Sequence, residues 1–118
     1  EQRNVYDIVL EAQLAAIDFI KAGASCFDAD KVARDIIVKA GYGDEFPHGL
    51  GHGVGTQVHE APTLNLKSTE ILQPNMAVTI EPGIYIPNRF GVRIEDLAIV
   101  TEFGIINKVK SEKQLIII

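Results

Sequence analysis

The spacing of the apolar residues changes once along this chain, near Phe46, and that change limits the folds it can adopt. Before it, apolar residues recur every three or four positions, as on one face of an amphipathic helix. They are Val5, Ile8, Val9, Ala12, Ala15, Ala16 and Phe19. This pattern predicts one helix over residues 1–22, ending at the lysine and glycine of residues 21–23.

A second helix is predicted directly after the first. Asp28 is a suitable N-cap, and Gly41 marks the end of the helical pattern. Between them, Val32, Ile36 and Ala40 fall on one apolar face. Two helices therefore account for the first third of the chain.

From Phe46 onward, apolar and polar residues alternate, which is the period of a half-buried strand. We predict strands near 48–55, 76–81, 92–101 and 104–109, and a terminal apolar run at Leu115–Ile118. Turn signals stand at Pro74–Asn75, Pro82–Gly83 and Pro87–Asn88. Helices followed by strands with short turns predict an α+β domain, with an antiparallel sheet and the helices on one face.

Composition narrows the class of protein. A chain of 118 residues with 47% hydrophobic content predicts one domain. Sixteen acidic against eleven basic residues give a formal net charge of −5 without a basic cluster, so we expect neither a nucleic-acid nor a membrane partner. A single cysteine, Cys26, and no secretory signal or membrane-spanning run predict a soluble, cytoplasmic protein. Because the chain opens at Glu1 inside a predicted helix, we expect it to be a piece of a longer protein.

All three histidines lie in FPHGLGHGVGTQVHE, residues 46–60, where every second residue from Gly49 to Gly55 is glycine. In a strand, His48 and His52 would share one face with Leu50 and Val54, and the glycines would face the other way. Such glycines often mark the close approach of another backbone or a ligand. The segment matches neither the dinucleotide-binding glycine pattern nor the zinc-binding helix pattern. Gathered imidazoles indicate a metal or acid–base site, and the alternative is hydrogen-bonded structural histidines.

Two carboxylates strengthen the first interpretation. In AVTIEPGIY, residues 77–85, Val78 and Ile80 face a core and Glu81 ends the strand. In GVRIEDLAIV, residues 91–100, Arg93 and Glu95 share a face, and the alternatives are a simple ion pair between them or a solvated sheet face. One histidine and two glutamates form a partial ligand set for Mn²⁺, Fe²⁺, Co²⁺ or Zn²⁺.

Three ordered motifs, HGLGHGVGTQVHE, MAVTIEPGIY and GVRIEDLAIVTEFG, resemble the C-terminal catalytic region of the prolidase, Xaa-Pro aminopeptidase and methionine aminopeptidase superfamily. The sequence RIED at 93–96 and the position of His48 resemble the Xaa-Pro branch more closely. The resemblance covers nearly the whole chain. It implies one half of a pita-bread fold, with residues 1–118 as the C-terminal part of a metallopeptidase catalytic domain whose upstream half is absent.

The resemblance also implies a role for each motif residue. His52 and Glu81 would be metal ligands, and Glu95 would bridge two divalent ions in the complete enzyme. We expect Mn²⁺, with Co²⁺, Zn²⁺ and Fe²⁺ as alternatives. The implied reaction is hydrolysis of the peptide bond before proline, in which Glu81 also carries a proton to the leaving nitrogen.

Three further residues complete the implied catalytic set. His48 and His59 would flank the substrate and steady the carbonyl and its developing charge. Arg93 would support the bridging carboxylate. The implied substrate is a proline-containing peptide.

The sequence departs from the family in one respect. The family's other two metal ligands are aspartates upstream of the helix that here begins at Glu1, and none of the aspartates present matches those positions. We therefore expect this chain alone to hold one ion or none, to have little or no activity, and to form a homo-oligomer through surface that the other half would cover. Alternatives are a non-catalytic or metal-free pita-bread binding module, and hydrolysis of a small C–N substrate as in creatinase-like relatives.

Overall fold

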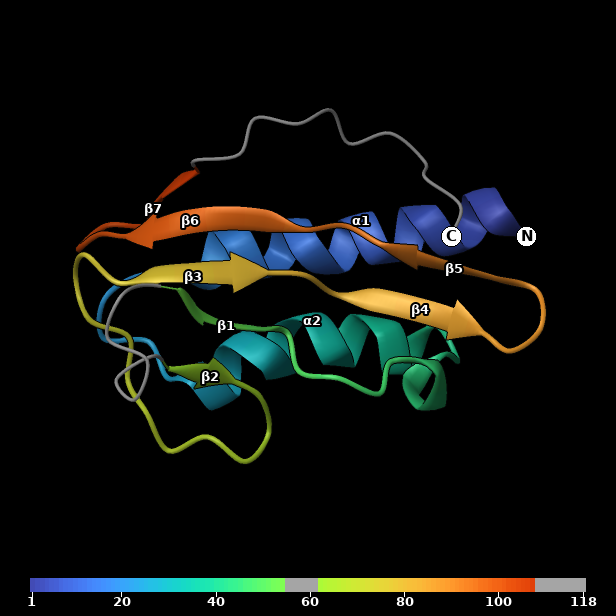
Figure 1. The fold of residues 1–118 in the computed structure, drawn as a ribbon, viewed down its shortest axis with the longest axis horizontal. Coiled ribbons are helices and arrows are strands. Elements are labelled where there is room, and N and C mark those ends of the chain that lie inside the picture. The colour runs from blue at the N-terminus through green and yellow to red at the C-terminus, as the bar shows by residue number, and fades with distance from the viewer. Residues whose placement is uncertain (55–61, 108–118) are drawn as a thin grey trace.

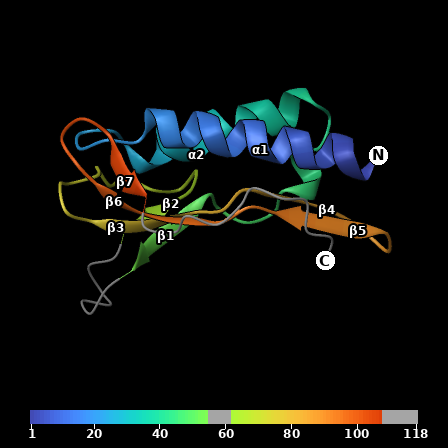
Figure 2. The same cartoon turned by 90° about the horizontal axis from the view of Figure 1, so that it is seen from above.

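The computed structural model describes residues 1–54 and 62–107, which form two layers. Two helices lie side by side over one face of an antiparallel sheet (Figures 1 and 2). The core lies between the layers and includes Val9, Ile20, Leu64, Ile80 and Ile84, all fully buried. The predicted α+β architecture, with helices on one face of the sheet, is confirmed. Neither described helix is long and apolar enough to cross a membrane.

Helix α1 spans Gln2–Phe19, three residues shorter than predicted at its end. The backbone becomes extended at Ile20, whose side chain enters the core. Beyond it, the amides of Ala22 and Gly23 donate to carbonyls of Thr101 and Leu72 instead of continuing the helical ladder. Contacts with distant parts of the chain therefore end this helix.

Helix α2 spans Cys26–Lys39 and begins earlier than predicted. Its N-cap is Ser25, whose hydroxyl accepts a hydrogen bond from the amide of Asp28 at 2.9 Å. Asp28 lies inside the first turn, where its negative charge interacts favourably with the positive end of the helix dipole.

The predicted apolar face of this helix is only partly right, since Ile36 packs against the core without being fully buried. Its buried residues are Cys26, Ala29, Asp30, Ala33 and Ile37, whereas Ala40 is exposed. Because aspartate is not apolar, Asp30 was not part of the hydrophobic pattern. The predicted face therefore lies about one residue away from the buried face that the structure shows. The packed face is instead set by Asp30 and the partners described below.

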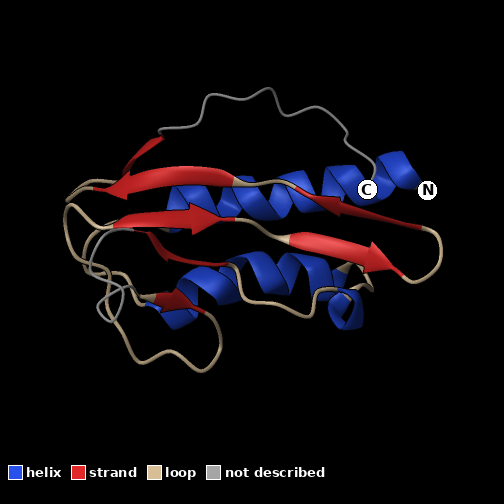
Figure 3. Cartoon of the chain, in the orientation of Figure 1, coloured by secondary structure: helices blue, strands red, loops and turns tan. Residues whose placement is uncertain are grey.

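Five strands form the main sheet in the order β2-β1-β3-β6-β7, labelled in Figure 1 and drawn red in Figure 3. They are β1 Gly51–Val54, β2 Thr63–Leu64, β3 Ala77–Ile80, β6 Asp96–Val100 and β7 Ile105–Asn107. Strands β4 Gly83–Ile86 and β5 Phe90–Arg93 form a separate antiparallel pair. Strands β2 and β4 were not predicted from the sequence, and the predicted strand over 92–101 overlaps both β5 and β6. The predicted run at 115–118 lies outside the described residues.

The main sheet and the β4–β5 pair are separated by a short break, and both predicted carboxylates lie in it. Ile80 pairs with Asp96 at the end of one ladder, and Gly83 pairs with Arg93 at the start of the other. Glu81 therefore lies in the gap on one side and Glu95 on the other.

The predicted turn at Pro82–Gly83 is wrong, because β4 runs onward in the direction of β3 (Figure 1). Proline has no amide to donate to a ladder, so it interrupts pairing here without reversing the chain. The chain reverses at Pro87–Asn88, where Asn88 has a φ of 62°, and Asn75 has a φ of 72° at the Pro74–Asn75 turn.

Candidate functional site

His52 and Glu81 meet on the sheet. His52 lies in β1 and Glu81 directly follows β3, and Nε2 of the imidazole lies 3.6 Å from Oε2 of the carboxylate. The His52 side chain is 60% exposed and that of Glu81 is 16% exposed. Two of the predicted ligands therefore come together with the imidazole open to solvent.

The tautomer of His52 decides what this pair can bind. Its Nδ1 lies 3.0 Å from the carbonyl oxygen of Gly53, so Nδ1 carries the proton and donates it. In the neutral ring, Nε2 then turns a lone pair toward the Glu81 carboxylate. Two electron-pair donors facing each other favour a cation or a proton between them. A histidine whose second nitrogen donates to a backbone carbonyl is also the usual form of a metal-ligating histidine, so the pair fits a divalent ion.

Close backbone packing fixes the position of His52. A Cβ atom on Gly51 would lie 1.9 Å from the carbonyl oxygen of Thr79 in β3, so only glycine fits there. The Thr79 hydroxyl accepts from the His52 amide at 3.0 Å and donates to the His52 carbonyl at 3.4 Å. A Cβ atom on Gly49 would likewise lie 2.8 Å from the carbonyl oxygen of Leu64. The predicted close approach of another backbone is confirmed at both glycines.

The predicted strand over 48–55 is only partly right, since β1 begins at Gly51. Leu50 is fully buried whereas His52 is exposed, so the two do not share a face. The reason is that residues before β1 are bound to helix α2 rather than continuing the regular strand.

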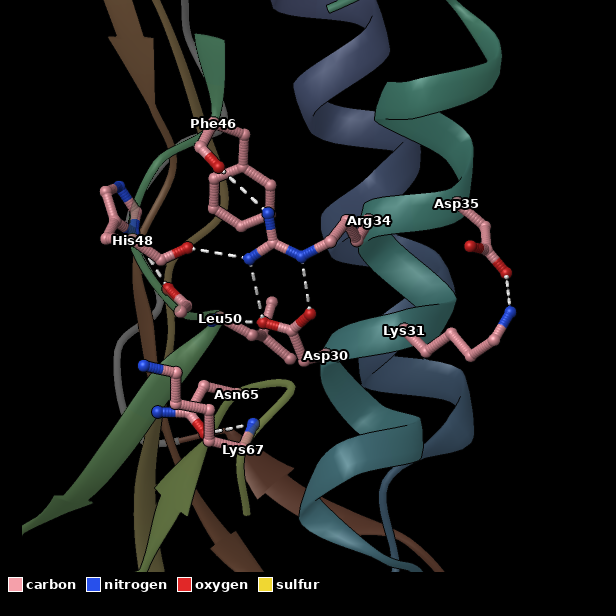
Figure 4. Close-up of polar contacts among 10 residues, drawn as sticks. Asp30, Lys31, Arg34, Asp35, Phe46, His48, Leu50, Asn65 and Lys67 are labelled. Atoms are coloured by element: carbon pink, nitrogen blue, oxygen red, sulfur yellow. Dashed lines mark hydrogen bonds and ion pairs between the residues drawn. The ribbon is translucent and has the colours of Figure 1, made fainter. Parts of the chain in front are cut away.

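Asp30 and Arg34 of α2 make that connection (Figure 4). Asp30 is fully buried and forms two hydrogen bonds with Arg34, Oδ1 to Nε at 2.7 Å and Oδ2 to the guanidinium at 3.1 Å. Arg34 also donates to the carbonyls of Phe46 and His48, each at 2.8 Å, and lies 4.1 Å over the Phe46 ring. Asp30 accepts from the amide of Leu50 at 3.0 Å.

We call Asp30 and Arg34 the α2 clamp. Sequence reasoning missed it, although an acid and a base four positions apart on a helix were a visible signal. The clamp holds the backbone of residues 46–50, from which the His48 side chain projects.

His48 is held on both ring nitrogens. Nδ1 lies 2.7 Å from the carbonyl oxygen of Gly49 and Nε2 lies 2.7 Å from the hydroxyl of Tyr85. Because the carbonyl can only accept, Nδ1 donates and Nε2 accepts from the tyrosine. The ring also packs edge-on against Phe46 and Tyr85. A hollow of about 320 Å³ adjoins His48, and its other lining residues are Arg34, Pro47, Gly49, Asn65, Leu66 and Lys67.

Tyr85, which sequence reasoning did not select, links His48 to the second carboxylate motif. Burial raises the pKa of its hydroxyl, the charge and hydrogen bond of Arg93 lower it, and the charge of Glu81 raises it further. Its side chain lies across the β4–β5 pair over Gly83 and Gly91. An added Cβ atom would lie 2.7 Å from its hydroxyl oxygen at Gly83 and 2.8 Å from its ring at Gly91. Tyr85 therefore contacts His48 directly, and the charges of Arg93 and Glu81 act on its hydroxyl.

The remaining predicted residues are not gathered in the same way. Arg93 and Glu95 are both exposed. Within residues 1–54 and 62–107, no group of three or more His, Cys, Asp or Glu side chains could hold a metal ion. The Glu95 side chain thus does not complete a three-ligand set with His52 and Glu81, and the roles given to Glu95 and Arg93 stay predictions. His59 lies outside the described residues.

Comparisons with known proteins agree on one family. Residues 1–102 match the model of metallopeptidase family M24. The Xaa-Pro dipeptidase of Pyrococcus furiosus is 47% identical over 116 residues, which are 98% of this chain and 33% of that protein. An uncharacterized peptidase of Staphylococcus haemolyticus is 54% identical over 104 residues, 88% of this chain and 30% of that protein.

Solved structures agree. A Xaa-Pro dipeptidase from Bacillus anthracis superposes with a TM-score of 0.91 at 53% identity, covering 97% of this chain and 32% of that one. The prolidase from Pyrococcus horikoshii OT3 also gives 0.91, at 46% identity, covering 97% of this chain and 33% of that one. The chain thus spans about a third of the length of these relatives. The expected fold, one α+β half of the pita-bread architecture, is confirmed.

Proposed function

This chain belongs to metallopeptidase family M24, and on that premise we propose that the full-length protein hydrolyses peptide bonds that precede proline. The relatives named as Xaa-Pro dipeptidases and prolidases support this substrate class. The observation that carries the proposal is the 3.6 Å approach of His52 Nε2 to Glu81 Oε2, with the other imidazole nitrogen engaged by a backbone carbonyl.

His52 and Glu81 would hold metal, and Glu95 would bridge the two ions of the complete site. Bound divalent ions, Mn²⁺ in our proposal, would supply a water of lowered pKa and polarise the scissile carbonyl. Glu81 would carry a proton to the leaving nitrogen. This is the proline ring nitrogen, which bears no hydrogen in the peptide bond. His48 and His59 would orient the substrate, and Arg93 would steady Glu95.

Residues 1–54 and 62–107 contain no group of three or more metal-ligating side chains, and no aspartate of the sequence matches the family's two upstream ligands. We therefore propose that it binds one ion weakly or none, and that it has little peptidase activity by itself. Its open sheet face, with exposed Arg93 and Glu95, is the surface through which we propose that it self-associates.

The test compares the full-length protein with two variants. Calorimetric titration of the metal-free protein with Mn²⁺ should give binding that Glu81→Gln abolishes or strongly weakens. Hydrolysis of a Xaa-Pro dipeptide should far exceed that of the matching Xaa-Ala dipeptide. Glu102→Gln, at an exposed residue, is the control and should change neither. Equal Mn²⁺ affinity in Glu81→Gln and wild type, or no preference for proline, would refute the proposal.

A further inference from the structure

Gln13 is a fully buried polar residue on helix α1 that contacts two distant parts of the sheet. Its Nε2 donates to the carbonyl oxygen of Ile80 at 3.3 Å and to that of Ile94 at 3.3 Å. These residues lie 67 and 81 positions away in the sequence. One side-chain amide therefore connects three separate segments of the chain.

The two carbonyls are next to the predicted metal-binding carboxylates. Ile80 directly precedes Glu81, and Ile94 directly precedes Glu95. Both stand where the β3–β6 ladder ends and the β4–β5 ladder has not yet begun. Regular ladder pairing is interrupted over the residues that carry the carboxylates, where the Ile94 amide donates to the Pro82 carbonyl at 3.3 Å. The Gln13 amide adds a hydrogen bond to each of the two segments at this interruption.

The orientation of the amide follows from its partners. A carbonyl oxygen only accepts, so the group facing both carbonyls is the NH₂ of Gln13, with one hydrogen for each. Both oxygens are thus held within two hydrogen-bond lengths of each other. Together with the backbone hydrogen bond from Ile94 to Pro82, this limits the separation of the backbones that lead into Glu81 and Glu95.

The oxygen of the same amide lowers the stability of the fold. Gln13 Oε1 is buried without a hydrogen-bond partner among the described residues. A buried acceptor without a partner destabilises a fold, and an aliphatic residue of similar volume would avoid this penalty. The two donated hydrogen bonds are the structural reason for glutamine at this position.

We propose that Gln13 is a positioning residue, which holds the backbone segments before Glu81 and Glu95 at a fixed separation through its carboxamide. The inference rests on the proposed function only for the use of these carboxylates as metal ligands. The link between Gln13 and the two segments stands without it.

The first measurement needs no metal. In the metal-free full-length protein, Gln13→Met keeps the volume of the side chain but removes both donors. Hydrogen exchange of the segments 78–84 and 92–97 should become about tenfold faster, because two hydrogen bonds that hold them are lost. Val9→Ala is the control, since Val9 is fully buried on the same helix but donates to neither carbonyl. It should lower the melting temperature without a selective effect on these segments.

The second measurement uses Mn²⁺ and a Xaa-Pro dipeptide. Gln13→Met should weaken Mn²⁺ binding about 10- to 100-fold, the usual loss when a group that orients metal ligands is removed. The kcat should fall while KM stays near the wild-type value, and Val9→Ala should retain wild-type Mn²⁺ affinity.

Two results would overturn the inference. Unchanged exchange of both segments in Gln13→Met would disprove the link itself. Faster exchange with unchanged Mn²⁺ affinity would show a structural contact that positions no ligand. If the wild-type protein neither binds Mn²⁺ nor cleaves Xaa-Pro, the proposed function fails instead, and the exchange measurement alone then decides whether Gln13 holds the two segments.

Discussion

The buried carboxylate of Asp30 accepts a hydrogen bond from the backbone amide of Leu50 at 3.0 Å, across twenty positions of sequence. The carbonyl of Leu50 in turn accepts from the amide of Glu81 at 2.7 Å. Helix α2 is thus connected through two hydrogen bonds to the backbone of a predicted metal ligand. The α2 clamp therefore supports both His48 and Glu81.

Replacing Asp30 by Ala should destabilise the protein strongly. Arg34, only 18% exposed, would lose its charge partner, and the Leu50 amide would keep only the Leu64 carbonyl as an acceptor. Loss of one partner of a buried pair costs about 3–5 kcal/mol. The free energy of unfolding, measured in urea, checks this value.

The same helix offers a matched control. Lys31 and Asp35 also form an acid–base pair four positions apart, but their side chains are 52% and 61% exposed (Figure 4). Asp35→Ala should change the unfolding free energy by no more than about 0.5 kcal/mol. Equal losses for the two aspartates would contradict the structural role assigned to the α2 clamp.

Gly51→Ala should distort the site as well as destabilise it. The new Cβ would overlap the Thr79 carbonyl, so β1 would have to move away from β3 and carry His52 with it. Overpacking of this kind costs about 1–3 kcal/mol. Denaturant titration and Mn²⁺ calorimetry check the two effects. Gly104→Ala, where nothing lies within 4 Å of the added atom, should affect neither.

Tyr85 should titrate above its ordinary pKa of 10 because of its burial. The folded state then keeps the phenol proton more strongly than the unfolded chain does. Its contribution to stability is therefore complete below the unfolded pKa and is lost as pH rises through the folded pKa. The difference in tyrosinate absorbance between wild type and Tyr85→Phe should show a midpoint above pH 10, and a midpoint below 10 would argue against a buried hydroxyl.

Cys26 should react slowly with iodoacetamide in the native protein. Burial raises the pKa of its thiol, with a hydrogen bond from Ser68 acting in the opposite direction, and the side chain is fully buried. Since the thiolate is the reactive form, labelling should require opening of the fold. Mass spectrometry at increasing urea should show labelling that follows unfolding, whereas rapid labelling without denaturant would show that this end of α2 is open.

The sequence alone predicted the α+β class, the order of helices before strands, and the position of Glu81 at the end of a strand. It also marked Gly49 and Gly51 as points of close backbone approach. These features depend on local periodicity and on residue types such as proline and glycine, whose conformational limits apply in any fold. The family resemblance rested on motifs in the same segments.

The tertiary structure decided the rest. It put Asp30 rather than Val32 and Ile36 at the centre of the buried face of α2, and it separated Leu50 from His52. It also brought Gln13 to the carbonyls of Ile80 and Ile94, and Tyr85 to His48. Each of these features is a hydrogen bond or contact between residues far apart in the chain, whose partners become known only when the helices and the sheet have packed together.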